Sequence, residues 1–161
     1  MENYSIRKIK KEDNQAVAAL IRAVFDELNI PKVGTAYEDP YLDLMFEEYN
    51  KPKSVYYVVE KDGKIIGSAG VAPLENEAET ICELQKMYFL PETRGLGIGS
   101  QMMAQCLQSA KDFGFEKCYL ETMPFMLDAQ KLYKKVGFEY ICSPMGSTGH
   151  TSCPVWMLKD L

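Results

Sequence analysis

The sequence lacks the features of a secreted, membrane-spanning or nucleic-acid-binding protein. Its five cysteines are odd in number and include no Cys-x-x-Cys pair, so we expect neither a disulfide framework nor a metal site. No apolar run approaches the roughly 18 residues of a membrane span, and the first residues show no signal peptide. With 23 acidic against 18 basic residues, nothing favours a partner rich in phosphate. These absences predict a cytoplasmic protein that binds no metal, membrane or nucleic acid.

Apolar residues make up 47% of the 161 positions, enough to form a core, and the length fits one domain. We therefore expect a single domain over residues 1–161. Alternating and helical patterns divide the chain into short elements. The expected strands are 4–9, 54–60, 65–71, 81–89, 117–122, 138–142 and 155–158, and the expected helices are 13–28, 40–49, 98–113 and 127–136.

The order of these elements predicts an α/β fold with a mixed sheet. Short turns join the early strands, which makes them antiparallel, whereas the unit over residues 81–122 crosses over through a helix. Such a crossover makes its two strands parallel. We therefore expect about six or seven strands, mostly antiparallel with one parallel pair, and helices on both faces.

A glycine-rich loop lies between the strand 81–89 and the helix that follows it. Its sequence is Arg94-Gly95-Leu96-Gly97-Ile98-Gly99-Ser100. Glycines let backbone approach a ligand, and free N–H groups at a helix start attract a phosphate. A P-loop is excluded because no lysine ends the run. A dinucleotide-binding loop, with Glu121 as its ribose-binding acid, and a plain strand–helix turn both stay open.

Two segments in the right order resemble the GNAT superfamily of acyl-CoA-dependent N-acetyltransferases. Residues 83–99 (Glu-Leu-Gln-Lys-Met-Tyr-Phe-Leu-Pro-Glu-Thr-Arg-Gly-Leu-Gly-Ile-Gly) resemble the core motif, which ends in Arg-x-x-Gly-x-Gly. Residues 132–138 (Leu-Tyr-Lys-Lys-Val-Gly-Phe) resemble the second signature. The resemblance implies the acyl-CoA N-acyltransferase fold with a splayed parallel pair. It also implies transfer of an acetyl group from acetyl-CoA to a primary amine by direct attack on the thioester.

The resemblance also implies where the cofactor would bind. The pantetheine arm would pair with exposed backbone of Met87 and Phe89 in the gap between the splayed strands, and the pyrophosphate would rest on residues 95–100. Met126 departs from the family, which often has asparagine there. The implied cofactor-binding residues are Met87, Tyr88, Phe89, Arg94, Gly95, Leu96, Gly97, Ile98, Gly99, Ser100, Met126 and Ala129.

Two side chains take catalytic positions by the same resemblance. Tyr133 is at the general-acid position and would protonate the departing thiolate, although an ordinary core tyrosine fits the sequence too. Glu83 is at the distance from Arg94 where several relatives keep a carboxylate base. A chain of water molecules and His150 stay open as alternative routes for the proton.

The acceptor itself has no sequence signature. We expect residues 14–49 and the loop around His150 to bind it, with His150 and Glu83 as contacts. The simpler alternative is that His150 is a surface-loop histidine without a role in binding. Cys153 nearby raises the idea of an acyl-enzyme, which the family usually does not use. An amine-bearing small molecule and a peptide both stay open as acceptors. The resemblance to the family also implies a possible homodimer. The alternatives in function are a non-catalytic acyl-CoA sensor and a dinucleotide-dependent oxidoreductase domain.

Overall fold

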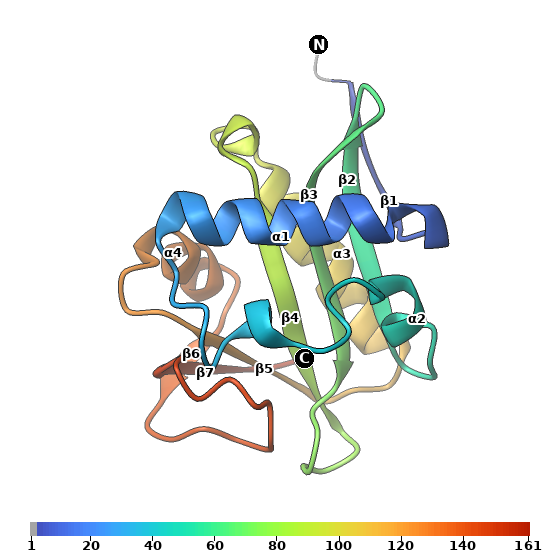
Figure 1. The fold of residues 1–161 in the computed structure, drawn as a ribbon. Coiled ribbons are helices and arrows are strands. Elements are labelled where there is room, and N and C mark those ends of the chain that lie inside the picture. The colour runs from blue at the N-terminus through green and yellow to red at the C-terminus, as the bar shows by residue number, and fades with distance from the viewer. Residues whose placement is uncertain (1–2) are drawn as a thin grey trace.

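A twisted seven-stranded sheet forms the centre of the computed structural model, which describes residues 3–161 (Figure 1). The strands run in the order β1-β2-β3-β4-β5-β7-β6. The pair β4–β5 is parallel, and the other neighbouring pairs are antiparallel. The strands are β1 (Tyr4–Lys8), β2 (Val55–Lys61), β3 (Lys64–Pro73), β4 (Ile81–Phe89), β5 (Lys117–Thr122), β6 (Glu139–Ile141) and β7 (Val155–Asp160).

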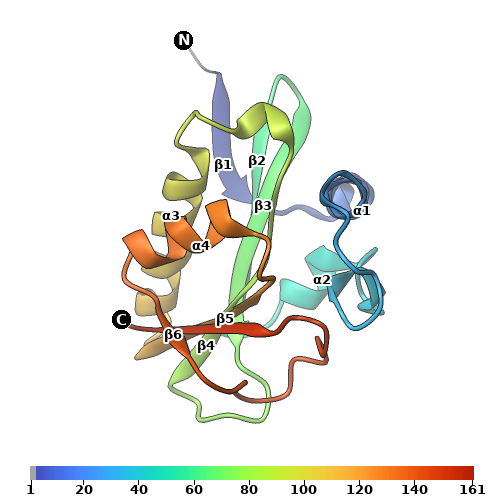
Figure 2. The same cartoon turned by 90° about the vertical axis from the view of Figure 1, so that its left-hand side faces the viewer.

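Helices cover both faces of this sheet, as the sequence predicts (Figure 2). The helices α1 (Asn14–Leu28) and α2 (Met45–Tyr49) lie on one face, and α3 (Ile98–Asp112) and α4 (Leu127–Lys135) lie on the other. Each face has its own apolar core because the side chains of a strand alternate between the two faces. On the first face, α1 buries a stripe of apolar side chains: Val17, Leu20, Ile21, Val24 and Phe25.

One local expectation, the start of the second helix, is wrong. The helix expected over residues 40–49 begins only at Met45, because tight turns occupy the preceding residues, with N–H groups of Leu42 and Leu44 donating to carbonyls three residues back. Asp13, the first residue of the expected helix 13–28, takes the N-cap position of α1, although its side chain makes no capping hydrogen bond. Its carboxylate instead pairs with Arg7 at 2.7 Å and accepts the N–H of Lys10.

A bulge in β4 decides which of its side chains lie on each face of the sheet. Ser68 pairs with Tyr88 and Gly70 with Gln85, so β4 has one more residue than β3 between these points. Lys86 takes the left-handed conformation there, with φ 49°. The bulge shifts the alternation of β4. Leu84, Met87 and Phe89 pack on the α3 face, whereas Gln85, Lys86 and Tyr88 contact side chains of the α1 face.

The parallel pair β4–β5 splays, as the resemblance implies. Its pairing runs only from Ile81 with Lys117 to Glu83 with Tyr119. Both strands continue beyond this point, to Phe89 and Thr122. The backbone of the second half of β4 is therefore unpaired on its β5 side, and a gap opens between the two strands.

Candidate active site

A groove of about 550 Å³ begins at this gap and ends at the glycine-rich loop. We call it the glycine-loop groove. Its lining includes every residue expected to bind the cofactor except Leu96, whose side chain packs against the core under α3. The expected lining residues are Met87, Tyr88, Phe89, Arg94, Gly95, Gly97, Ile98, Gly99, Ser100, Met126 and Ala129.

The loop end of this groove suits an anion. Gly95 and Gly97 have φ of 79° and 74°, and a Cβ on either would meet nothing within 4 Å. Gly97 is the N-cap of the fifteen-residue helix α3. The first N–H groups of that helix have no carbonyl partner within it, so they can hold a phosphate. Arg94 lines the same end and pairs with Glu27 at 2.6 Å.

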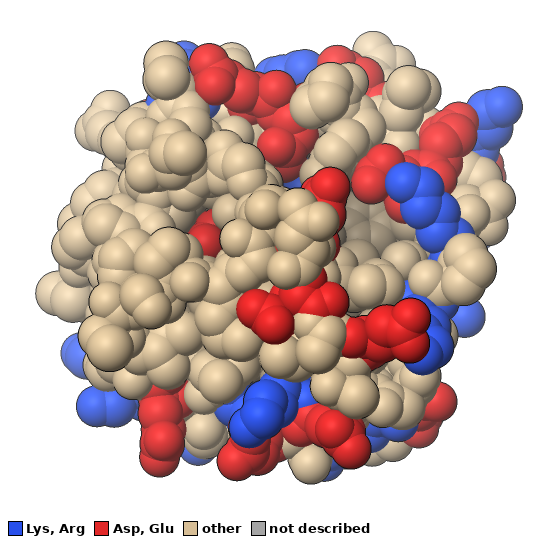
Figure 3. All heavy atoms as spheres, turned by 90° about the horizontal axis from the view of Figure 1, so that it is seen from below, with Lys and Arg blue, Asp and Glu red and all other residues tan. Residues whose placement is uncertain are grey.

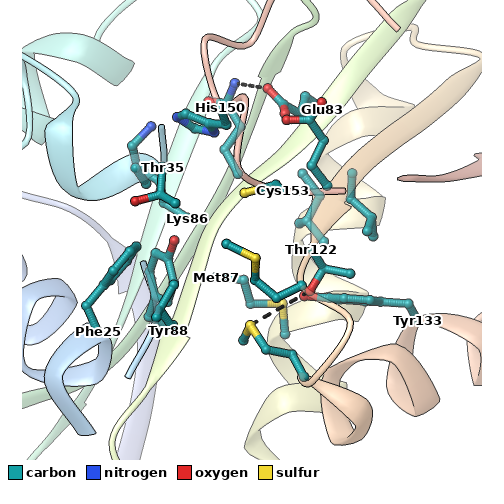
Figure 4. Close-up of a pocket in the computed structure, with 18 residues that line it drawn as sticks. Phe25, Thr35, Glu83, Lys86, Met87, Tyr88, Thr122, Tyr133, His150 and Cys153 are labelled. Atoms are coloured by element: carbon teal, nitrogen blue, oxygen red, sulfur yellow. Dashed lines mark hydrogen bonds between the residues drawn. The ribbon is translucent and has the colours of Figure 1, made fainter. Parts of the chain in front are cut away.

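Tyr133 projects from α4 toward the splayed strands (Figure 4). Its ring packs edge-on against Phe138, with centroids 6.0 Å apart. Burial raises the pKa of its phenol to about 12, so the hydroxyl keeps its proton at neutral pH. Within residues 3–161 this hydroxyl forms no hydrogen bond with the protein. A protonated donor thus faces the groove without a competing acceptor.

A second, smaller cavity of about 70 Å³ adjoins the groove, and we call it the inner cavity. Met87, Tyr88, Met126 and Tyr133 line both spaces. Figure 4 shows that Tyr133 lies at one end of this cavity, while Glu83 and His150 lie at the other. The fold therefore brings together the three side chains that the sequence singled out for proton transfer and acceptor binding.

Glu83 is a buried carboxyl group on β4, with 6% of its surface exposed. Burial raises its pKa to about 7, and a hydrogen bond from Gln85 at 2.7 Å offsets part of that effect. The charge of Glu121 adds to the rise. Gln85 is itself held by the hydroxyl of Tyr49 on α2. A carboxyl group with this pKa can take up a proton at neutral pH and release it again.

A buried ion pair beside Glu83 escaped the sequence analysis. The ammonium of Lys86 lies 2.7 Å from Asp39, and the side chains are only 2% and 12% exposed. Burial alone would lower the pKa of Lys86, but Asp39 raises it, and the ammonium also donates to the hydroxyl of Tyr41. Asp39 reaches His150 as well, at 3.0 Å from Nε2. His150 therefore has a partner, and its side chain is only 16% exposed, so it is not a solvated surface histidine.

Glu121 and its partners hold the C-terminal loop (residues 142–154) over the cavity, a role that the sequence analysis did not assign to them. Glu121 accepts hydrogen bonds at 2.6 Å from the hydroxyls of Tyr119 and Thr148. It lines the inner cavity and not the glycine-loop groove, so it does not suit the ribose of a dinucleotide. Burial raises the pKa of Cys153 to about 12, which disfavours the thiolate that an acyl-enzyme requires.

A mixed sheet with one splayed parallel pair, and a phosphate-suited groove entering the splay, define the acyl-CoA N-acyltransferase fold. Residues 15–138 match the acetyltransferase (GNAT) family, and the chain belongs to that family. It is an N-acetyltransferase. The uncharacterized N-acetyltransferase YjgM of Escherichia coli (strain K12) is 41% identical to it over 157 residues, which cover 97% of this chain and 94% of that protein.

Solved structures agree on the fold. A GNAT-family acetyltransferase from Staphylococcus aureus Mu50 has a TM-score of 0.85 and 19% identity, over 98% of this chain and 99% of that one. The PaiA N-acetyltransferase from Thermoplasma acidophilum, solved in complex with coenzyme A, has a TM-score of 0.70 and 19% identity, over 99% of each chain. Within residues 3–161, no helix has the length and apolar character needed to cross a membrane.

Proposed function

We propose that the chain acetylates a primary amine with acetyl-CoA, and that Glu83 and Tyr133 carry the two proton transfers. One observation carries the proposal: Glu83 and Tyr133 line a single cavity that joins the glycine-loop groove at Met87 and Tyr88. An acceptor in this cavity would have a base on one side and an acid on the other. The placement suits a reaction that removes a proton from nitrogen and delivers one to sulfur.

The glycine-loop groove fits the donor. Its loop end offers the amides at the start of α3 to the pyrophosphate, and the unpaired backbone of β4 beside Met87 offers hydrogen bonds to the pantetheine arm. Acetyl-CoA supplies an acetyl group activated as a thioester. Met126, where the family often has asparagine, lines the groove with an apolar side chain, so the arm would rely there on backbone contacts.

Glu83 would accept the proton of the acceptor ammonium. The free amine has the lone pair needed to form the new N–C bond, whereas the ammonium has none. Tyr133 would give its hydroxyl proton to the thiolate as the C–S bond breaks, since its raised pKa keeps that proton in place until then. The nitrogen loses a second proton as the amide forms, and that proton restores the phenol of Tyr133, so each turnover leaves one net proton on Glu83. Glu83 then releases this proton to solvent.

Release of free thiol from acetyl-CoA in the presence of a panel of primary amines tests the proposed activity. We expect release that depends on the amine, and a fall of about 100-fold in kcat for Tyr133→Phe, the lower range for loss of a general acid. Acetyl-CoA affinity should change little, because the ring remains. Binding of acetyl-CoA without thiol release for any amine would favour the non-catalytic sensor.

A further inference from the structure

A third cavity, which we call the outer cavity, connects Glu83 with solvent. It has a volume of about 440 Å³ and lies between α2, the end of β3 and the C-terminal loop. Glu83, Gln85, Lys86 and His150 line both the inner and the outer cavity. The two cavities therefore adjoin at these side chains, and we call the route from the surface past Glu83 toward Tyr133 the acceptor path. The acceptor would enter it from the side opposite the glycine-loop groove.

The charges along this path are unbalanced. The outer cavity is lined by two lysines, and each already has a carboxylate partner: Lys51 pairs with Glu48 at 3.1 Å and Lys86 pairs with Asp39 at 2.7 Å. Among the described residues that line the path, Glu75, Glu83 and Glu121 form no ion pair. Three carboxylates therefore lack a cation, while neither lysine is free to bind an anion.

Figure 3 shows the end of the molecule that includes this mouth, where acidic side chains gather around a hollow. Glu75 lines the mouth at the end of β3, and Glu83 lines its depth on β4. Ala72 pairs with Glu83, and Glu75 follows Ala72 by three residues in the turn after β3, so Glu75 lies closer to that turn than Glu83 does. One alkyl chain can place a nitrogen near each of them.

The inner cavity limits the shape of the reacting end of the acceptor. About 10–15 Å³ of such space holds one water molecule. The 70 Å³ available beside Glu83 and Tyr133 therefore admits only a few heavy atoms. An amine on an unbranched methylene chain fits this space. An α-amino group would bring a branched carbon and a carboxylate among Glu83 and Glu121.

We propose that the acceptor is an unbranched alkyl amine with a second ammonium group at its far end, a di- or polyamine that enters through the outer cavity. The reacting nitrogen lies at Glu83 and the distal ammonium lies at the mouth near Glu75. This inference rests on the proposed function, because it assigns an acceptor to the same site. It adds the chemical class that the family does not fix.

Three amines that share a four-carbon chain and differ in the charge of the far end test the inference. Putrescine ends in an ammonium, butylamine in a methyl group, and gamma-aminobutyrate in a carboxylate. Calorimetry at pH 8 should show putrescine binding about two- to fivefold more tightly than butylamine, the effect of one exposed ion pair. Gamma-aminobutyrate should bind most weakly. The differences should shrink near 1 M salt, where the Debye length is about 3 Å.

A pair of variants on the turn between β3 and β4 separates the local charge from the net charge. Glu75→Gln should bring the affinities for putrescine and butylamine closer together, because it removes the carboxylate at the mouth. Glu79→Gln removes the same charge from the same turn, but Glu79 does not line the cavity, so the ratio of these affinities should stay as it is. An equal loss of the ratio in both variants would overturn the role of Glu75.

The outcomes distinguish this inference from the proposed function. Equal binding of butylamine and putrescine would overturn it in favour of an amine with one charge, such as the side chain of a peptidyl lysine. Tightest binding of gamma-aminobutyrate would overturn it in favour of a carboxylate-bearing acceptor. A failure of putrescine to bind would also overturn it. The expected binding order without thiol release from acetyl-CoA would support the charge preference of the cavity and contradict the proposed activity. Thiol release at equal rates with all three amines would support the proposed activity and contradict the inference.

Discussion

Glu83 is the residue whose ionisation should control the rate. Its pKa is raised to about 7, chiefly by burial, so the carboxylate that accepts a proton forms only as the pH rises through neutrality. Below that pH the group is protonated and cannot act as a base. The position of Glu83 could be predicted from its distance to Arg94 in the motif. Its pKa could not, because burial under α2 and the charge of Glu121 arise from distant parts of the chain.

The pH dependence of kcat/KM therefore tests Glu83 directly. We expect kcat/KM to rise with pH up to about 7 and then level off. Glu83→Gln should lower the rate at pH 8 by about 100-fold and remove the inflection, because the amide takes up no proton. Tyr133→Phe is the matched control, since it should lower the rate and keep the inflection. An inflection near 7 that survives in Glu83→Gln would assign the base to another group.

The C-terminal loop over the acceptor path is the element whose position matters most. Gly146 has φ 61°, and a Cβ there would meet the backbone oxygen of Glu75 and lie 2.8 Å from Cγ of Leu74. The N–H of Ser147 donates to the same oxygen at 2.8 Å. The loop thus lies against the β3–β4 turn, and Thr148 and His150 follow it into the site.

A pair of alanine substitutions separates close packing from backbone strain in this loop. Gly149 has φ 76°, but a Cβ there would meet nothing within 4 Å. Both substitutions cost about 1–2 kcal/mol through the left-handed conformation, and Gly146→Ala adds a clash. We expect Gly146→Ala to raise the KM for the acceptor more than Gly149→Ala does, with acetyl-CoA affinity unchanged in both. Steady-state kinetics measures this, and equal effects would contradict the packing of the loop against the turn.

Local pattern predicts most elements of this fold, and long-range contacts account for what it misses. The expected strand 117–122 is β5, residue for residue, because its apolar run ends in clear turn signals. The bulge at Lys86 leaves no trace in the alternation of β4, so neither the facing of Lys86 nor its pairing with Asp39 could be read from the sequence. The shortened α2 reflects turns around Leu42 that its apolar pattern did not reveal.

At the scale of the whole molecule, the proposed donor and acceptor sites lie in separate cavities that meet near the splayed strands. In the proposed function, the glycine-loop groove would bind the donor, and the inner and outer cavities would bind the acceptor. The groove and the inner cavity meet at Tyr133 and Met87. Eleven of the twelve residues that the resemblance implies for cofactor binding line the glycine-loop groove, and their contact with the cofactor stays a prediction. The acceptor cavities depend on contacts between distant segments, which the motifs do not fix. A single domain, a cytoplasmic location and a homodimer stay predictions from the sequence.

The most direct measurement is a calorimetric titration of the chain with acetyl-CoA, with NAD as a parallel ligand. We expect acetyl-CoA to bind and NAD to give no heat of binding. Gly97→Glu should weaken the binding of acetyl-CoA by at least about tenfold, because a carboxylate at the start of α3 repels the pyrophosphate. Gly114→Glu is the control, since Gly114 is also left-handed with open space around it but follows the other end of α3. A folded chain that does not bind acetyl-CoA would contradict the account, and so would an equal loss of acetyl-CoA affinity in both variants.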